Sequence, residues 1–469
     1  MPNFEPSQVP EIIFDRQPQW RALYYEAWRI ASEHIICNPQ PPFFPYMDEG
    51  ASSDRVWIWD SCFMALYCKY APDFFPGMAS LDNLYMILHD KIPTGRKIHH
   101  PDNPPLFGWT ELDYYRFQGD RKRAVRIFEE KKYLQKHYEF FEKCRAGATV
   151  PCCVKPVALE KKELGYLWAG CPSGMDNTPR GRGSYGSIFW VDALAQQALS
   201  ALCIAEFAAE FGHTGEERKY RALWKQQCAL LNQYYWDEKD GIYYDIFCDT
   251  HDFCKVLTPA SFWPLLAGAA EKDQVRRMIS VLRDPDKLGG IIPSVSRDDP
   301  DYDPAGRYWR GGVWIPVVYM IVRALNQVGE FEFAAELSEK MLERMAHTWK
   351  NTEPHTIWEC YSPSQDAPST KSNGQFCRTN FCGWSALTPI SMLIENVMGL
   401  YDIRASDRTI RMHRRKIGRF GISNLKFGTI RCDIIADDRH IRITVDQPVT
   451  LEVDGRKYPC GQGETIIRA

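Results

Sequence analysis

The sequence predicts a mainly α protein: an (α/α)6 barrel, or six-hairpin toroid, with a small C-terminal β-sheet domain. From about residue 18 to residue 400, apolar residues recur at three- and four-residue spacing, as in Leu194, Ala198, Leu202 and Ala205. Short turns at residues 211–215 and 328–330 join neighbouring helices into antiparallel hairpins. After about residue 402, apolar and polar residues alternate, which is typical of half-buried strands.

The helical part divides at Gly, Pro and capping residues into about twelve segments, one of which is centred near residue 132. Six hairpins in a ring form a barrel whose helix ends and long loops enclose a pocket. A superhelical repeat array is the alternative, but the sequence has no fixed-period self-similarity to support it. Long connections inside a compact domain are usually functional, and here they contain Trp, Gly and Pro. We therefore expect pocket-forming loops at residues 92–108, 146–187, 284–310 and 351–381.

The C-terminal part is expected to form strands at residues 431–436, 441–445 and 449–453. Asp454-Gly455 is a strong hairpin signal between the last of these strands and residues 457–460. The surface of this part is charged and lacks an aromatic platform. We therefore expect two domains, a catalytic barrel at residues 1–402 and a structural β cap at residues 403–469.

The composition argues against several classes of partner. The net charge of -3 and the absence of a long basic run disfavour nucleic acid and anionic membranes. No stretch approaches the ~20 apolar residues of a membrane span. The N-terminus lacks a signal-peptide pattern, and the sixteen cysteines are read as reduced thiols, so we expect a cytoplasmic protein. No Cys/His spacing suits zinc, and we expect neither metal nor organic cofactor. The oligomeric state is left open.

The excess of aromatic residues, with 15 Trp, 23 Tyr and 24 Phe, is the most informative feature of the composition. A single Trp near a helix end can simply pack a hydrophobic corner. Several Trp residues beside Gly, Pro, Asp or Arg favour a pocket for a small carbohydrate, because sugar rings present apolar faces edged with hydroxyls. The Trp residues in such settings are Trp57, Trp59, Trp109, Trp168, Trp309, Trp358 and Trp384.

Two segments each place one carboxylate among Gly, Pro and aromatic residues. Asp176 follows Ser173-Gly174, and Glu359 follows Trp358. One protonated and one ionised carboxyl are the minimum equipment for cleaving a glycosidic bond. The alternatives are a turn or helix cap at Asp176 and an ion-paired Glu359. We interpret the pair as general acid and general base.

Three further segments suit sugar binding. Asp60 follows Trp57 and Trp59 where a helix opens, and it either holds hydroxyls or caps that helix. Residues 102–109 combine Asp and Asn with Pro-Pro and Trp. In residues 308–314, Gly311-Gly312 either lets the backbone approach a ligand or simply starts the next helix.

The order of these motifs resembles glycoside hydrolase family 63, including its mannosylglycerate hydrolase-type bacterial members, and more distantly the trehalases of family 37. The resemblance covers about residues 50–400. Its most specific elements are Ser-Gly-x-Asp-x-x-Pro-Arg at residues 173–180 and Glu-x-Tyr-x-Pro at residues 359–363. Asn103 replaces a common Gln, and Cys360 replaces a common Asn or Lys, which leaves the substrate open.

The resemblance implies an inverting α-glycosidase with Asp176 as acid and Glu359 as base. It would act exo on small α-glucosides or α-mannosides, of disaccharide or glycosyl-glycerate type. The resemblance also implies that the subsite of the cleaved sugar is lined by Trp59, Asp60, Asn103, Trp109, Arg310 and Trp384. The further expected substrate contacts are Arg55, Trp57, Phe107, Asn177, Arg180, Trp309, Trp314, Trp358 and Tyr361.

Two other functions fit the same scaffold. A sugar epimerase, lyase or unsaturated-uronide hydrolase is the first. Epimerases of this fold are similar in using paired His residues, and the candidate loops contain only His99, His100 and His355. We expect that His99 and His100, being adjacent, cannot both point inward on regular structure. A non-catalytic sugar-binding protein is the second, but it would need no acid–base pair.

Overall fold

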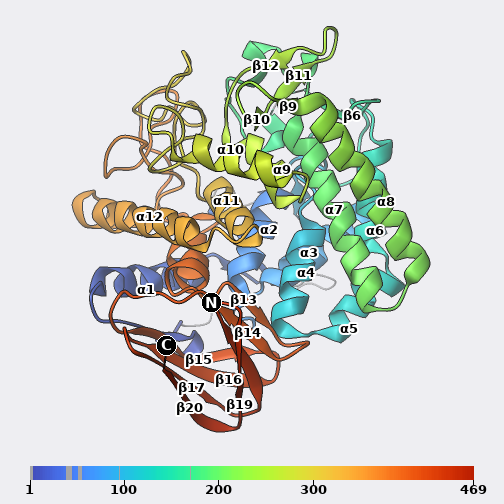
Figure 1. Ribbon diagram of the computed structural model, residues 1–469. Helices are drawn as coiled ribbons and strands as arrows, with labels where there is room; N and C mark the ends of the chain where they lie inside the picture. Colours follow the sequence, from blue (N-terminus) through green and yellow to red (C-terminus); the bar gives the residue numbers. More distant parts are fainter. Residues whose placement is uncertain (1–3, 38–44, 51–54, 94–95, 170, 469) are drawn as a thin grey trace.

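The computed structural model describes residues 4–37, 45–50, 55–93, 96–169 and 171–468. Helices make up most of it, and β-sheets pack below them at the end where both chain termini lie (Figure 1). Some helices end in π-helical turns: Met86–Asp90 after α3, Val125–Glu130 after α5 and Leu231–Tyr235 after α8, while Thr388–Val397 forms a separate π-helical segment. The α-helices are α1 (Pro18–Glu33), α2 (Ile58–Cys68), α3 (Gly77–Tyr85), α4 (Phe107–Gln118), α5 (Arg121–Ala124), α6 (Tyr133–Lys143), α7 (Val191–Glu210), α8 (Thr214–Leu230), α9 (Trp263–Leu266), α10 (Lys272–Arg283), α11 (Ile315–Gln327) and α12 (Phe331–Asn351).

The expected hairpin turns are confirmed at two positions. α7 ends at Glu210 and α8 begins at Thr214, while α11 ends at Gln327 and α12 begins at Phe331. Gly212 and Gly329 have φ of 76° and 86°, which the turns require and glycine adopts without strain. The single helix expected near residue 132 is instead two helices, because Lys132 adopts a left-handed conformation with φ of 53°.

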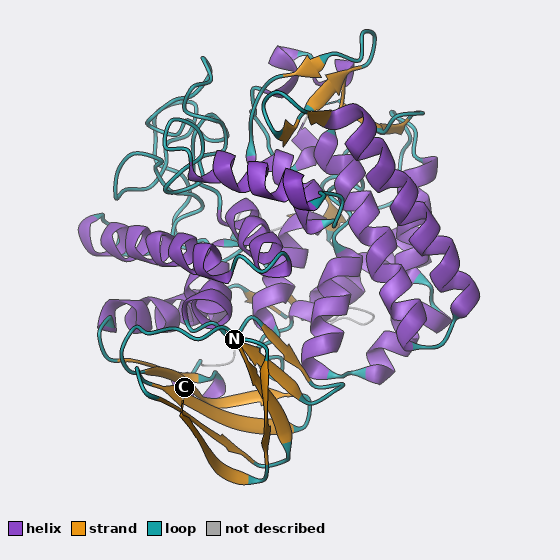
Figure 2. Ribbon diagram, viewed as in Figure 1, coloured by secondary structure: helices purple, strands orange, loops and turns teal. Residues whose placement is uncertain are grey.

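The C-terminal strands form two sheets (Figure 2). The predicted strands near 431–436, 441–445 and 449–453 and the hairpin at 454–455 are confirmed. All neighbours are antiparallel except β14 and β18. The five-stranded sheet has the order β1 (Glu11–Phe14), β15 (Phe420–Phe427), β16 (Ile430–Ala436), β17 (His440–Val445) and β20 (Gly463–Arg468). The four-stranded sheet has the order β13 (Asp402–Arg404), β14 (Thr409–Met412), β18 (Val449–Val453) and β19 (Arg456–Cys460).

Strand β1 departs from the expected division at residue 402. It lies near the N-terminus yet pairs with β15, placing Ile12 opposite Ile422. Because Ile12 and Phe14 are buried, this strand extends the apolar face of the C-terminal sheet. The sheet is therefore built from both ends of the chain.

Short strands also occur in the connections between the helices, some of them at the opposite end of the molecule from these sheets (Figure 1). Each contains only two or three residues. They are β2 (Ile35–Ile36), β3 (Tyr46–Met47), β4 (Arg55–Val56), β5 (Lys97–Ile98), β6 (Leu159–Lys161), β7 (Tyr166–Trp168), β8 (Ile188–Phe189), β9 (Trp236–Asp237), β10 (Ile242–Tyr243), β11 (Asp245–Phe247) and β12 (Phe253–Cys254).

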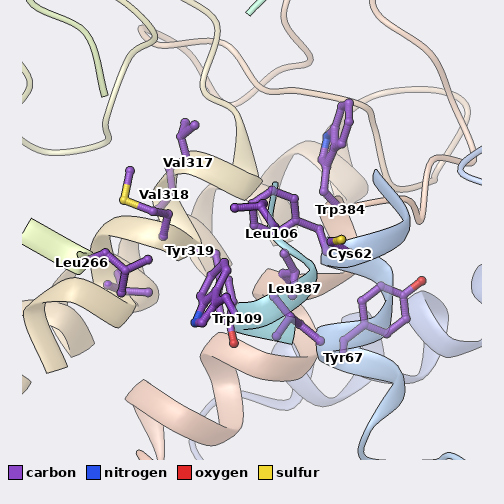
Figure 3. Close-up of a cluster of buried hydrophobic side chains, with 14 of the residues drawn as sticks. Cys62, Tyr67, Leu106, Trp109, Leu266, Val317, Val318, Tyr319, Trp384 and Leu387 are labelled. Carbon is purple, nitrogen blue, oxygen red and sulfur yellow. The ribbon is translucent and has the colours of Figure 1, made fainter. Parts of the chain in front are cut away.

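The hydrophobic core runs between the helices, and Figure 3 shows part of it. Trp109 from α4 lies inside this cluster beside Tyr319 from α11, with ring centroids 6.2 Å apart. Trp384 stands at its edge, toward the loops. All sixteen cysteines are free thiols, most of them buried. Among the described residues, no helix is both long and apolar enough to span a membrane.

Candidate active site

A pocket of about 540 Å³ opens among the long loops. The four connections that the sequence predicts as pocket-forming all contribute to its wall, together with Glu49, Trp57, Trp59, Asp60, Trp314 and Trp384. A volume of this size suits a small ligand. Of the site residues expected from the sequence, nine line the pocket: Trp57, Trp59, Asp60, Asn103, Asp176, Trp309, Trp314, Glu359 and Trp384.

Five tryptophans form the apolar part of the wall. The rings of Trp309 and Trp314 are stacked with centroids 4.1 Å apart, and Trp384 meets Trp314 edge to face at 5.7 Å. Across the pocket, Gly174 has φ of 84° and lies so close to Trp59 that a Cβ would come within 3.2 Å of the indole. The loop of Asp176 therefore packs directly on the ring of Trp59.

Asp176 lies in the loop after the helical turn Cys171–Ser173 and is exposed to the pocket. Among the described residues, its carboxyl has no hydrogen-bond or ion-pair partner. The pKa of Asp176 is raised to about 6, mainly because the surrounding protein desolvates the carboxyl. The charge on Glu359 adds to this shift, and the charge on Arg378 opposes it. A carboxyl in such a setting retains a proton at mildly acidic pH, as a general acid requires.

Glu359 has the opposite surroundings. Oε1 accepts a hydrogen bond of 3.0 Å from the hydroxyl of Tyr308 and lies 3.2 Å from the Arg378 guanidinium. Oε2 accepts from the backbone N–H of Arg378 at 3.3 Å. These three donors hold the carboxylate oxygens in a fixed orientation, which a general base requires.

Backbone contacts hold the loop of Glu359 in place. The indole N–H of Trp384 donates to the carbonyl of Glu359 at 2.9 Å, and Glu359 N–H donates to the carbonyl of Arg378 at 2.9 Å. Two residues on, Tyr361 exchanges two backbone hydrogen bonds with Val313, of 2.8 and 3.1 Å. The loop of the base is thereby bound to the segment that carries Tyr308.

Asn177 joins the loop of the acid to the same segment. Its side-chain oxygen accepts a hydrogen bond of 2.7 Å from the backbone N–H of Trp309, and its carbonyl accepts one of 2.9 Å from Arg310. Arg310 is also paired with Asp301. Asn177 and Arg310 do not line the pocket. Both therefore help to set the position of Asp176, and their expected contact with substrate stays a prediction.

Arg180 is likewise a support and not the expected substrate contact. It is fully buried, and its guanidinium makes paired hydrogen bonds of 2.6–2.7 Å to Asp192 at the start of α7 and to Asp245 in β11. It also lies 4.2 Å from the ring of Trp190. These contacts occupy its donors, so Arg180 fixes the acid loop from below the pocket.

Four other expected substrate contacts are core residues that do not line the pocket. Phe107 packs on Tyr85, and Trp109 packs on Trp263 and Tyr319. Trp358 and Tyr361 are also buried, with the Tyr361 hydroxyl accepting a hydrogen bond from the backbone of Trp358. Arg55, in β4, is half-buried and also absent from the lining.

The pocket wall contains residues that the sequence reasoning missed. Arg378 and Glu49 carry no motif in the sequence, and Lys155 lies in a segment read only as loop. Tyr308 belonged to a quoted motif without being given a role. No local signal identifies the first three, because contacts between distant loops bring them to the site.

His99 and His100 both line the pocket, and neither lies in regular structure, to which the expectation applied. The chain bends immediately after β5, so successive side chains no longer point to opposite faces as they do in a strand. His99 stacks on Trp57 with centroids 5.1 Å apart. Burial, with the charges of His99 and Lys155, lowers the pKa of His100 to about 4. His355 lies outside the lining, and its Nδ1 is 2.7 Å from the carbonyl of Trp349.

Asp60 and Glu49 add two more carboxyls. Burial is the main cause that raises the pKa of each well above its usual value, and neighbouring carboxylates add to it. Within the described parts of the chain, no group of three or more His, Cys, Asp and Glu is arranged to hold a metal ion.

Residues 54–379 match the family described as the mannosylglycerate hydrolase MGH1-like glycoside hydrolase domain. A probable mannosyl-oligosaccharide glucosidase of Schizosaccharomyces pombe is 25% identical, covering 76% of this chain and 50% of its own, so the chain spans about half of that relative.

Two solved structures support the fold alone. The family 63 mannosylglycerate hydrolase of Thermus thermophilus is 18% identical, with a TM-score of 0.60 over 79% of this chain and 99% of its own. The neutral trehalase of Saccharomyces cerevisiae is 15% identical, with a TM-score of 0.56 over 76% of both chains. On the family match over residues 54–379, the chain belongs to the mannosylglycerate hydrolase MGH1-like glycoside hydrolases of family 63.

Proposed function

We propose that this protein is an inverting α-glycosidase that acts exo on small α-glucosides or α-mannosides, of disaccharide or glycosyl-glycerate type. Asp176 donates a proton to the glycosidic oxygen, and Glu359 removes a proton from the water that attacks the opposite face of the sugar. Such chemistry needs roughly 6.5–9.5 Å between the two carboxyl groups, which leaves room for the water.

The contrast between the two carboxyls is the observation that carries the proposal. Asp176 lacks a partner and has a pKa of about 6, while Glu359 faces Tyr308 and Arg378. Two carboxyls in one pocket with opposite surroundings are typical of an acid–base pair. Trp57, which lines the pocket and is only half-buried, offers an apolar face for a sugar ring.

We also propose that the helices close a complete (α/α)6 barrel. The α7–α8 and α11–α12 hairpins and the likeness to the hydrolase and trehalase structures support this closure. A barrel closed at the end near the C-terminal sheets would be open only at the other end. This shape favours attack on the ends of a sugar chain over cleavage inside it.

The test is hydrolysis of a panel of α-linked disaccharides and glycosyl-glycerates, with the product anomer read by NMR before mutarotation. We expect wild type to release the β-anomer and both Asp176→Asn and Glu359→Gln to lose activity. Release of the α-anomer would overturn inversion, and undiminished activity in both variants would overturn the site.

A sugar epimerase is the second candidate, because His99 and His100 both line the pocket. The same NMR experiment, run with free monosaccharides, distinguishes it. Conversion of one sugar into its epimer, lost in His100→Gln and retained in Glu359→Gln, would favour the epimerase.

A further inference from the structure

Glu49 is a pocket residue without an assigned role. It lies just after β3, in a turn held by hydrogen bonds from Gly50 N–H to the Asp48 side chain and from Asp48 N–H to the His34 carbonyl, each of 2.9 Å. Gly383 packs so closely on it that a Cβ at that glycine would lie 2.9 Å from the Cβ of Glu49. The backbone on both sides therefore holds Glu49 against the pocket.

The carboxyl of Glu49 is incompletely satisfied. Glu49 is only 2% exposed, and its Oε1 has no hydrogen-bond partner within the described chain. Buried polar atoms are nearly always paired, because an unpaired one forfeits its hydration without compensation. An orphaned oxygen on a pocket wall indicates a partner that arrives with the ligand.

Among the charged neighbours of Glu49, Asp60 has the largest effect on the pKa of the Glu49 carboxyl, which it raises. Asp60 opens α2 and lines the same pocket. Four carboxyls, those of Glu49, Asp60, Asp176 and Glu359, thus share a pocket whose lining contains one arginine, Arg378. Full ionisation of all four would leave buried like charges unpaired, so protons must be retained on some of them.

A carboxyl that keeps its proton donates a hydrogen bond, and an ionised carboxyl accepts one. Two carboxyls of one pocket that hold one proton between them therefore offer one donor and one acceptor to the same ligand. Adjacent hydroxyls of a sugar present the complementary pair, since each hydroxyl both donates and accepts. An apolar or singly hydroxylated ligand would leave one of the two carboxyls unmatched.

We propose that Glu49 is a specificity residue, which together with Asp60 binds two neighbouring hydroxyls of the sugar at the cleaved position. This inference rests on the proposed function, because it assumes that a sugar occupies the pocket. It assigns Glu49 a role in binding and none in bond cleavage.

Binding of unreactive probes tests it. Methyl α-D-glucopyranoside, methyl α-D-mannopyranoside and their monodeoxy analogues are titrated against the full chain, with fluorescence of the pocket tryptophans as the readout. We expect Glu49→Gln to weaken binding of the better parent glycoside by about tenfold, the typical effect of losing a hydrogen bond to a charged group. For the deoxy analogue that lacks the hydroxyl bound by Glu49, the dissociation constants of wild type and Glu49→Gln should agree within about twofold.

The selectivity for one hydroxyl distinguishes this role from a merely structural one, which would weaken all probes equally. Asp48→Asn is the matched control: it changes the preceding carboxyl, which does not line the pocket, and keeps the oxygen that accepts from Gly50. It should bind all probes as wild type does. If Glu49→Gln does not fold, Glu49→Asp withdraws the carboxyl by one methylene and should show the same selective loss.

Equal weakening for every probe, or unchanged binding of the parent glycoside, would overturn the role of Glu49 while wild-type sugar binding still stood. If wild type bound neither parent glycoside, both this inference and the proposed sugar substrate would fall.

Discussion

The hydroxyl of Tyr308 donates a hydrogen bond of 3.0 Å to Oε1 of Glu359, the same oxygen that Arg378 contacts at 3.2 Å. Tyr308 comes from the loop before α11, and Arg378 comes from the loop that follows Glu359. Two loops therefore fix one carboxylate oxygen and leave the other facing a single backbone donor. This arrangement orients the carboxylate as a base and suggests the first prediction.

Tyr308→Phe should lower kcat by about tenfold with little change in KM, because one hydrogen bond to a charged group is lost while the aromatic wall stays. Steady-state kinetics on the best substrate of the panel measures this. Tyr302→Phe, on the same loop but outside the pocket lining, is the control and should match wild type. A loss confined to KM would mean that Tyr308 binds substrate and does not orient the base.

Activity should fall as the pH rises through about 6. A general acid works only in its protonated form, and the pKa of Asp176 is raised to about 6 by the desolvating protein around the pocket and by Glu359. The protonated fraction, and with it kcat/KM, should therefore decline along a basic limb with a midpoint near that value. A pH–rate profile measures the limb. A profile that stayed flat to pH 9 would contradict Asp176 as the acid.

Asp176→Asn should stabilise the fold at pH 8 and not at pH 3.5. The folded-state pKa of about 6 exceeds the unfolded value of about 3.9, so the folded state binds this proton more tightly. The carboxyl therefore costs stability as the pH rises from about 4 to about 6, and Asn removes that cost. Thermal unfolding at both pH values gives the difference in Tm. A variant that is less stable at pH 8 would contradict the raised pKa.

Arg180→Met should lower the free energy of unfolding by about 3–5 kcal/mol, because it leaves two buried carboxylates, Asp192 and Asp245, without their partner. Urea denaturation measures the loss. The triple variant with Asp192→Asn and Asp245→Asn should recover part of it, since no charge is then left unpaired. Normal stability combined with a raised KM would instead restore Arg180 as a substrate contact.

Trp109→Phe and Trp384→Phe should separate a core role from a pocket role. Trp109 packs among Phe63, Trp263 and Tyr319, so its loss should cost roughly 1–3 kcal/mol of stability and leave KM unchanged. Trp384→Phe removes part of the pocket wall and the donor to the Glu359 carbonyl, so KM should rise and kcat fall. Denaturation and kinetics on both variants decide this, and a raised KM for Trp109→Phe would contradict its core position.

The sequence predicted the helical hairpins well because their signals are local. The turn between α7 and α8 is visible as Gly212 between two amphipathic segments, and the β18–β19 hairpin as Asp454-Gly455. It did not predict that β1 joins β15, since such pairing depends on contacts between residues about 410 positions apart. The break at Lys132 was missed because nothing in the flanking pattern marks a left-handed residue.

The candidate acid and base were predicted from their motifs, and the structure brings both to one pocket. The roles of their neighbours could not be predicted from residue type. Arg180, Trp109 and Trp309 look alike in sequence, as large side chains next to Gly, Pro or helix ends. Only Trp309 lines the pocket, because burial depends on which face of a loop meets the rest of the fold.

By itself, the sequence determined the helical architecture, the C-terminal strands and two carboxylates in loops, since propensity, periodicity and turn chemistry act over a few neighbouring residues. The tertiary structure alone decided which groups surround those carboxylates. It brings Tyr308 and Arg378 to Glu359, leaves Asp176 without a partner among the described residues, and places Glu49 and Asp60 in the wall of one pocket. The physical reason is that burial and charge, which set the protonation of a carboxyl, arise from loops that are distant in the chain and adjacent only after folding.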